Sequence, residues 1–316
     1  NHSTITEFLL LGLSADPKIQ ALLFVLFLMI YLLTLMGNLM MILVIHTDSK
    51  LHTPMYLFLS HLSSQDLFYS SVTVPKMLEN LLSQRKAISV DGCLAQVFFV
   101  FATTGIEACL LSVMAYDRYA AICHPLLYGQ MMSKQVCVRL VWGSWVVAFL
   151  DALINTLLAL NLDFCELQTI PHYSCELPSL FPLSCSDTST NAAMLLCSAL
   201  FHAIGTCLLI FFSYARIVAT ILSISSTSSR SKAFSTCSSH LTAVSLFYGS
   251  AVLRYLMPTS GSPLELILSI QYSVITPLLN PLIYSLKNKE VKAALRRMML
   301  YYSHSFTLFC RWKKAW

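Results

Sequence analysis

Long runs of apolar residues, separated by short polar stretches, follow one another along the whole chain. The first run, residues 21 to 45, contains no Asp, Glu, Lys or Arg. A helix rising about 1.5 Å per residue over this length crosses the roughly 30 Å hydrocarbon core of a bilayer. Six more runs follow, so the pattern predicts an all-α membrane protein, a seven-transmembrane helix bundle. The predicted helices cover about residues 21–46, 54–79, 93–124, 136–160, 191–223, 232–257 and 264–286.

Little chain lies outside these helices. An N-terminal segment, 1–20, precedes the first of them. Basic and apolar residues alternate at helical spacing over about 287–300, which predicts a short amphipathic helix lying on the membrane surface. Residues 1–300 therefore form one domain, and 301–316 form a tail. With 56% hydrophobic and 11% charged residues, the chain does not have the composition of an ordinary soluble protein.

Lysine and arginine are distributed unequally between the two ends of the predicted helices. Fifteen of the 20 lie on the side that carries the C-terminal tail, and five lie on the other side. Since positive residues favour the cytoplasmic side, we expect a multi-pass plasma-membrane protein with an extracellular N-terminus and a cytoplasmic C-terminus. The net charge of +5 then reflects topology, and no nucleic-acid partner is expected. Asn1 begins an Asn-His-Ser sequon on the outer side, so it is a candidate glycosylation site.

Four of the 11 cysteines fall at or beyond the predicted outer helix ends, where disulfides form: Cys93, Cys165, Cys175 and Cys185. Four cysteines allow three pairings, and spacing alone does not choose among them. Their spacing matches no zinc-binding pattern.

Two acidic residues lie deep within predicted helices, Asp66 in the second and Glu107 in the third. Carboxyl groups in the bilayer core are costly and usually face a cavity or a partner. Each could be a neutral, hydrogen-bonded acid of structural use only. Alternatively, the pair shares one proton or binds a Na⁺ ion, the one cofactor that the sequence suggests. Asp151, in the fourth helix, is less central, and we expect a structural role for it.

The third predicted helix ends in the triplet Asp117, Arg118, Tyr119. An arginine in this place is either a membrane anchor that reaches the interface or a restrained group released to meet a cytoplasmic partner. The triplet alone favours the anchor. The seventh helix ends in Asn280-Pro281 with Tyr284 one turn later, and a proline there breaks a backbone hydrogen bond and kinks the helix.

Together these motifs resemble the rhodopsin-like G-protein-coupled receptors and, more narrowly, the odorant receptors. The stretches that carry the resemblance are LHTPMYLFLS at 51–60, MAYDRYAAICHPLLY at 114–128, SY at 213–214, KAFSTCSSHL at 232–241, FYG at 247–249 and PLLNPLIYSLKN at 277–288. The resemblance implies a receptor, not an enzyme, that binds a small volatile odorant within the bundle. It also implies activation of a stimulatory, olfactory-type G protein and a rise in cAMP.

The resemblance assigns roles to particular residues. It implies disulfides between Cys93 and Cys175 and between Cys165 and Cys185. It places the following residues in the coupling and switch machinery: Asp117, Arg118, Tyr119, Tyr214, Asn280, Pro281 and Tyr284.

Two positions depart from the broader receptor class. Tyr248 stands where that class usually has a tryptophan followed by a proline, and the base of the sixth helix carries Arg230 and Lys232 where an acid is common. We therefore expect Asp117 and packing to restrain Arg118. Odorant receptors share both of these departures.

Helical spacing combined with the resemblance gives a candidate ligand set, on faces of the third, fifth, sixth and seventh helices. The set is Phe101, Thr104, Gly105, Ala108, Ser198, His202, Tyr248, Val252, Tyr255, Ile270 and Ser273. It is mostly apolar with a few hydroxyls, which suits a small, weakly polar ligand. No carboxylate lies on these faces, so an amine held by a salt bridge is not expected.

The sequence disfavours three other functions. A peptide or lipid receptor of the same fold is disfavoured by the FYG and KAFSTCSSH stretches. A proton-coupled transporter is disfavoured because the seven spans show no internal repeat and no paired broken helices. An enzyme is disfavoured because no nucleophile, base and orienting group stand together in the sequence.

Overall fold

A computed structural model describes residues 5–165, 168–256, 262–298 and 300 of the chain. Within these ranges, the side chains of Ser229, Lys232, Thr236, 251–256, 286 and 287 are not described. The candidate glycosylation site Asn1 and the tail 301–316 lie outside the described residues.

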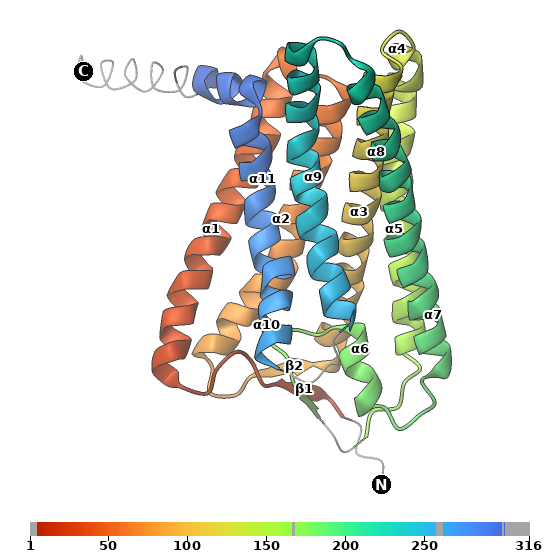
Figure 1. Cartoon of the computed structure of the whole chain (residues 1–316). Helices are drawn as coiled ribbons and strands as arrows, with labels where there is room; N and C mark the ends of the chain where they lie inside the picture. The colour runs from red at the N-terminus through yellow and green to blue at the C-terminus, as the bar shows by residue number, and fades with distance from the viewer. Residues whose placement is uncertain (1–4, 166–167, 257–261, 299, 301–316) are drawn as a thin grey trace, which may run out of the picture.

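Long helices run side by side along one axis (Figure 1). Five of them are α1 (Pro17–Thr47), α2 (Pro54–Leu82), α3 (Val90–Cys123), α5 (Lys134–Ala159) and α9 (Thr227–Leu256). The predicted helical bundle is confirmed. The helix predicted over 232–257 begins earlier, at Thr227.

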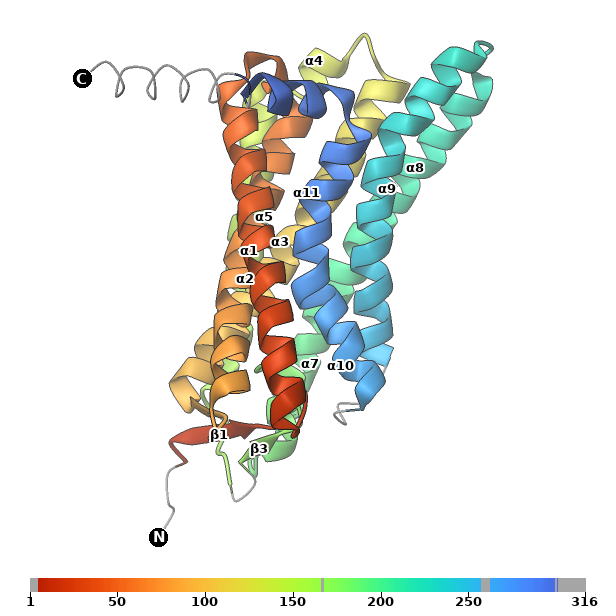
Figure 2. The ribbon, with the colours of Figure 1, turned by 90° about the vertical axis from the view of Figure 1, so that its left-hand side faces the viewer.

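Two further long helices each contain a π-helical segment. The first consists of α7 (Ser189–Ala199), η3 (Leu200–Gly205) and α8 (Thr206–Ser223); the second of α10 (Pro263–Ile270), η4 (Gln271–Ile275) and α11 (Thr276–Lys287). Both η3 and η4 are π-helical turns, which are rare and frequent at functional sites. With these two composite helices, the described part of the chain has seven long helices. Of these, α11 lies between α1 and α9 (Figure 2).

Helix starts follow from local chemistry. Asp16 caps α1 by accepting a hydrogen bond from the backbone N–H of Lys18, and Pro17 occupies the first turn, where no amide proton is needed. Ser89 and Ser133 cap α3 and α5 in the same way. Pro54 opens α2.

Five of the seven long helical segments are apolar enough to cross a membrane on length and composition alone, with mean hydropathies from 1.5 to 2.5. The other two, α2 and α9, carry more polar side chains. Those of α2 are largely inside the bundle: Gln65 and Asp66 are fully buried. The outer surface of α1 is instead lined with exposed leucines and methionines.

One end of the bundle is closed by a lid, at the bottom of Figure 1. The lid contains a small sheet in the order β2 (Ala87–Ser89), β1 (Glu7–Leu10), β3 (Thr169–Ile170), with β1 antiparallel to β2 and parallel to β3. Two short helices, α6 (Leu177–Leu180) and η2 (Phe181–Leu183), complete it. This sheet was not predicted, because strands of two to four residues leave no periodic pattern.

Two disulfides hold the lid. Cys93 at the start of α3 is bonded to Cys175, and Cys165 is bonded to Cys185. The backbone N–H of Cys175 also donates to Gln96 Oε1 (2.8 Å), so the lid segment is fixed to α3 at two adjacent points.

The opposite end carries η1 (Ser49–Leu51), α4 (Tyr128–Met131) and a helical segment at 289–298. This segment is anchored to the turn after α1, because Arg297 Nε donates to Asp48 Oδ2 (3.0 Å). The hydrogen bond from Arg297 lowers the pKa of Asp48, so the pair stays ionised at neutral pH.

Candidate functional site

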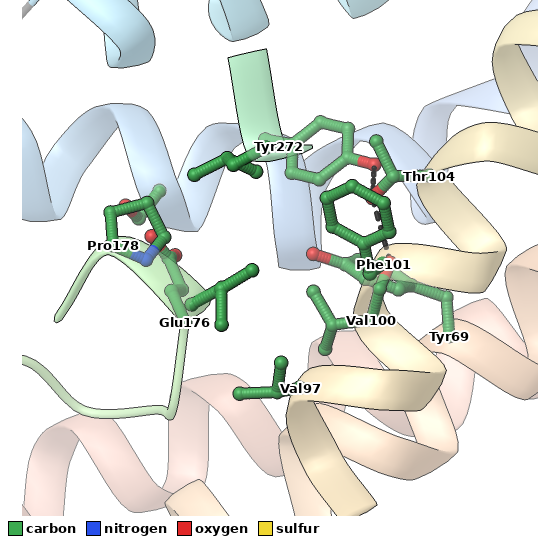
Figure 3. A pocket seen from close by; sticks show the side chains of 11 residues that line it. Tyr69, Val97, Val100, Phe101, Thr104, Glu176, Pro178 and Tyr272 are labelled. Carbon is green, nitrogen blue, oxygen red and sulfur yellow. Dashed lines mark hydrogen bonds between the residues drawn. The ribbon is translucent and has the colours of Figure 1, made fainter. Parts of the chain in front are cut away.

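A cavity of about 100 Å³ lies beneath the lid, between α3, α10, η4 and the segment after Cys175 (Figure 3). Its walls are mostly apolar, with a few hydroxyls and one carboxylate. The lining residues are Tyr69, Val97, Val100, Phe101, Thr104, Glu176, Leu177, Pro178, Leu195, Ser269 and Tyr272.

The hydroxyls at one wall form a short chain. Tyr272 donates to Thr104 Oγ1 (2.7 Å), and Thr104 donates to the carbonyl of Val100 (2.8 Å) one turn earlier in α3. Because Tyr272 lies in the π-helical turn η4, this chain joins η4 to α3 across the cavity wall. A ligand that fills the cavity therefore touches both helices at once.

Two of the predicted ligand residues, Phe101 and Thr104, line this cavity. Gly105 faces elsewhere: a Cβ built on it would lie 3.0 Å from Ala148 Cβ and 3.2 Å from His202 Cε1. Its lack of a side chain lets α3, α5 and η3 approach one another closely. Ala108 is buried in the core below.

Ser198 and His202 share a face, as predicted, and both reach Asp151 of α5. Ser198 donates to Asp151 Oδ1 (2.7 Å), and His202 Nε2 lies 3.1 Å from Asp151 Oδ2. Asn155 donates to Ser198 Oγ (2.9 Å). Asp151 thus joins a polar cluster between α5 and the fifth long helix.

The remaining candidates join helices to their neighbours. Tyr248 contacts Thr206 (2.5 Å); since Thr206 donates its only proton to a backbone carbonyl, Tyr248 is the donor. Ser273 is hydrogen-bonded to Tyr173 of the lid segment (2.7 Å). Ile270 packs against the apolar cluster between α1 and α2. The side chains of Val252 and Tyr255 lie outside the described residues.

Sequence reasoning missed several residues of this cavity, among them Tyr69, Glu176, Ser269 and Tyr272. Ser269 and Tyr272 each precede by one position a residue that was predicted, Ile270 and Ser273. Glu176 belongs to the lid, which helical spacing does not address. Glu176 directly follows Cys175, which is bonded to Cys93 in the first turn of α3. This proximity was the only sequence feature that indicated a place for Glu176 near the cavity.

The two buried acids lie close together deeper in the bundle, on the side of the cavity away from the lid. The side-chain amide of Asn280 lies 3.0 Å from Asp66 Oδ2 and 3.5 Å from Glu107 Oε1, so these two oxygens are no more than about 7 Å apart. Gln65 approaches Glu107 Oε2 from the other side (3.4 Å). The amide oxygens of Asn280 and Gln65 are both buried without a hydrogen-bond partner.

This group supplies oxygen atoms only. Among the described residues, no three His, Cys, Asp or Glu side chains gather as a transition-metal site would require. A hard cation such as Na⁺ binds carboxylate oxygens, which Asp66 and Glu107 supply here. The amide groups of Asn280 and Gln65 turn their nitrogens toward these carboxylates.

Arg118 lies at the far end of α3. Its guanidinium pairs with Asp117 Oδ2 (2.5 Å from Nη2), and Tyr128 of α4 donates to the other carboxylate oxygen (2.7 Å). Arg118 also lines a larger cavity, of about 790 Å³, together with Tyr284 and residues of α9 such as Ser235. The restraint on Arg118 therefore comes from its own neighbour in sequence.

Two other switch candidates are tyrosines that are hydrogen-bonded to histidines. Tyr119 is hydrogen-bonded to His124 (2.9 Å), and Tyr214 to His240 Nδ1 (2.8 Å). His240 Nε2 lies 2.9 Å from the carbonyl of Leu111, which can only accept. His240 therefore donates from Nε2 and accepts from Tyr214, joining α3, α8 and α9 through one neutral ring.

Asn280 and Pro281 lie on α11, where Pro281 packs on α1. A Cβ built on Gly37 would lie 3.3 Å from Pro281 Cγ, so the glycine provides the space for the proline ring. Asn38 donates to the carbonyl of Pro277 (2.9 Å), four residues before Pro281, which is the carbonyl that a proline leaves without its helical partner.

Comparison with known proteins agrees with this geometry. The family model described as olfactory receptor matches residues 27–302. The human olfactory receptor 8S1 is 73% identical over 92% of this chain and 81% of its own length. The human olfactory receptor 8A1 is 50% identical over 95% and 92%. The crystal structure of squid rhodopsin superposes with a TM-score of 0.71 at 17% identity, covering 91% of this chain and 87% of the other.

These matches span nearly the whole bundle, from α1 to the helical segment after α11. The rhodopsin likeness shows a shared fold, and the family model and the relatives show kinship in sequence. Enzymatic activity is not a property of this family. The chain belongs to the olfactory receptor family of rhodopsin-like G-protein-coupled receptors.

Proposed function

We propose that this protein binds a small volatile odorant in the cavity beneath the lid and activates a stimulatory, olfactory-type G protein, which raises cAMP. The observation that carries the proposal is the position of two cavities on one helix. Thr104 lines the small cavity and Arg118 lines the large one. They are 14 positions apart on α3, about 21 Å along its axis.

The orientation in the membrane is part of this proposal. The lid, with both disulfides, faces the extracellular side, and the end with Arg118 faces the cytoplasm. Disulfides persist in the oxidising extracellular compartment, and the excess of Lys and Arg lies at the opposite end. The large cavity is then accessible to a G protein.

Signalling follows from a shift between two arrangements of the bundle. An odorant that contacts α3 and η4 shifts the equilibrium only if it binds the active arrangement better, and each tenfold preference contributes about 1.4 kcal/mol. In the active arrangement α9 moves outward, Arg118 leaves Asp117, and Tyr214 and Tyr284 turn toward it. Tyr248, bonded to Thr206, and Tyr255 transmit the change.

An odorant panel with a cAMP readout tests the ligand site. In Tyr272→Phe the bond to Thr104 is lost, and we expect the effective odorant concentration to rise about fivefold, the effect of about 1 kcal/mol. Tyr31→Phe, which removes a hydroxyl on α1 outside the cavity, is the matched control and should leave the response unchanged. Unchanged potency in Tyr272→Phe, with normal surface delivery, would place the odorant elsewhere.

We further propose that Asp66 and Glu107 act as one unit that holds a single positive charge, a shared proton or a Na⁺ ion. Two carboxylates this close in a buried site repel one another unless such a charge lies between them. Asn280, hydrogen-bonded to Asp66 and directed at Glu107, couples them to α11.

A double-mutant cycle on thermal stability tests this coupling. Asp66→Asn and Glu107→Gln should be non-additive by 1 kcal/mol or more, about the scale measured for groups in direct contact. The melting temperature is then compared in Na⁺ and in N-methylglucamine at equal ionic strength. A higher value in Na⁺ shows that the shared charge is a Na⁺ ion, and equal values show that it is a proton. Asp151→Asn, which changes a partly buried acid on α5, is the control and should add independently. Additive effects of the first two variants would show two separate structural acids.

A further inference from the structure

The side chain of Tyr69, on α2, ends in a hydroxyl group at the odorant cavity. Only 3% of this residue is exposed, and its hydroxyl is directed into the open space of the cavity (Figure 3). The carbonyl of Tyr69 accepts a hydrogen bond from Thr73 within the helix, but its hydroxyl has no hydrogen-bond partner among the described residues. A buried hydroxyl without a partner is costly, so we expect this one to meet a ligand.

Aromatic packing holds the Tyr69 ring in place. Its centroid lies 5.4 Å from that of Tyr272 in η4, with the two rings tilted by 58°. The ring of Tyr272 in turn lies 5.8 Å from that of Phe247 in α9, edge to face. Three helices therefore fix the position of the Tyr69 hydroxyl, and a ligand can reach it without breaking a hydrogen bond of the protein.

The other hydroxyls that line the described walls of the cavity already have partners. Tyr272 donates to Thr104 Oγ1 (2.7 Å), and Thr104 donates to a backbone carbonyl (2.8 Å). Ser269 Oγ lies 3.0 Å from His172 Nε2, within hydrogen-bond distance. Among the described residues that line the cavity, Tyr69 thus has the one hydroxyl that is left to donate to a ligand without giving up a bond.

Hydrocarbon groups surround this donor. Val97, Val100 and Phe101 of α3 line the cavity together with Leu177 and Pro178 of the lid. A ligand that fills the space displaces water from the hydroxyl, so the ligand itself must supply the acceptor. A carbonyl oxygen accepts a hydrogen bond and asks for none in return, whereas a hydrocarbon ligand would leave the hydroxyl buried and unpaired.

We propose that Tyr69 makes the cavity selective for small, neutral carbonyl compounds such as ketones. Its hydroxyl donates to the carbonyl oxygen, and the hydrocarbon part of the ligand packs against Val97, Val100 and Phe101. The proposal rests on the odorant-binding function proposed above and names the chemical class of the ligand. It adds α2 to the third, fifth, sixth and seventh helices, whose faces gave the candidate ligand set.

Two matched ligand series test the proposal: 2-alkanones, and the 2-methyl-1-alkenes in which C=CH₂ replaces C=O with little change of shape. Both are applied to the full-length receptor in cells with a cAMP readout. We expect the ketones to act at concentrations at least tenfold lower than the alkenes. Tyr69→Phe keeps the ring and removes only the hydroxyl, so the ketone response should move at least fivefold toward higher concentration while the alkene response stays within twofold. Tyr31→Phe removes a hydroxyl that contacts Ser71 of α2 outside the cavity, and this control should change neither response.

The outcomes separate this proposal from the general one. Equal potency of ketones and alkenes, or a Tyr69→Phe variant that shifts both responses equally or neither, overturns carbonyl selectivity while the odorant function stands. If neither series raises cAMP in cells with receptor at the surface, the melting temperature of the purified receptor is measured with each series. A larger rise with ketones that is lost in Tyr69→Phe supports the carbonyl site and leaves only the coupling in error, whereas equal rises or no rise overturn it.

Discussion

Replacing Arg118 by alanine should abolish the cAMP response while leaving odorant binding within about twofold of the wild type. Arg118 lies about 21 Å along α3 from Thr104, so its loss does not reach the ligand cavity. Its guanidinium and the ammonium group of Lys289 are the cationic groups among the described residues that line the large cavity, which we assign to the G protein. The measurement combines cAMP accumulation with ligand-induced stabilisation of the purified receptor.

Two further variants sharpen this result. Asp117→Asn weakens the ion pair that holds Arg118, so it should raise basal cAMP without odorant. Arg139→Ala removes an exposed arginine at the same end of the bundle and should behave as wild type. If Arg118→Ala reached the surface and still raised cAMP normally, Arg118 would be a membrane anchor and the coupling role would be wrong.

Loss of the Cys93–Cys175 disulfide should reduce surface delivery more than loss of the Cys165–Cys185 disulfide. The first closes a separation of 82 residues and the second one of 20. On chain-entropy arguments these loops are worth about 4.5 and 3 kcal/mol, respectively. The first bond also joins the lid to α3, whereas the second lies within the lid segment.

Paired Cys→Ser variants, assayed by surface immunostaining and thermal melting, compare the two bonds. Cys109→Ser changes a cysteine that is not in a disulfide and serves as the control. If the receptor melted at the same temperature without the Cys93–Cys175 bond as without the Cys165–Cys185 bond, the larger role given to the Cys93–Cys175 bond would be wrong.

The helical bundle followed from sequence because crossing a bilayer leaves a long, uniform apolar pattern. The lid left no such pattern. Its strands are two to four residues long, and its fold depends on disulfides and on hydrogen bonds between distant segments such as Cys175 and Gln96. Those contacts have no periodicity for a sequence to reveal.

On the seventh long helix, the predicted ligand residues differ from the residues that line the cavity. The seventh long helix was assigned Ile270 and Ser273, but Ser269 and Tyr272 line the cavity. One residue along a helix is a rotation of about 100°, so a small error in register exchanges a wall residue for a packing residue. The π-helical turn η4 begins at Gln271, between the two pairs, and spacing rules for a regular α-helix do not anticipate it.

Partners of buried polar groups were the hardest to foresee. Asp151 was assigned a structural role, but its contacts with Ser198 and His202 required knowing which faces of α5, α7 and η3 meet. The same holds for His240, which joins Tyr214 to Leu111 from inside a serine-rich stretch.

The strand β1 fixes the number of residues that can separate it from α1. It is the middle strand of the lid sheet, with Phe8 and Leu10 buried and Leu9 turned outward. Only residues 11–16 connect it to α1, and this spacer turns at Gly12, whose φ of 72° suits glycine. Adding or removing one residue there would shift the strand by one position and turn Phe8 and Leu10 toward solvent, because side chains alternate along a strand. Apart from Gly12 at the turn and Asp16 at the cap of α1, the number of residues in this spacer therefore constrains the sequence more than their identity does.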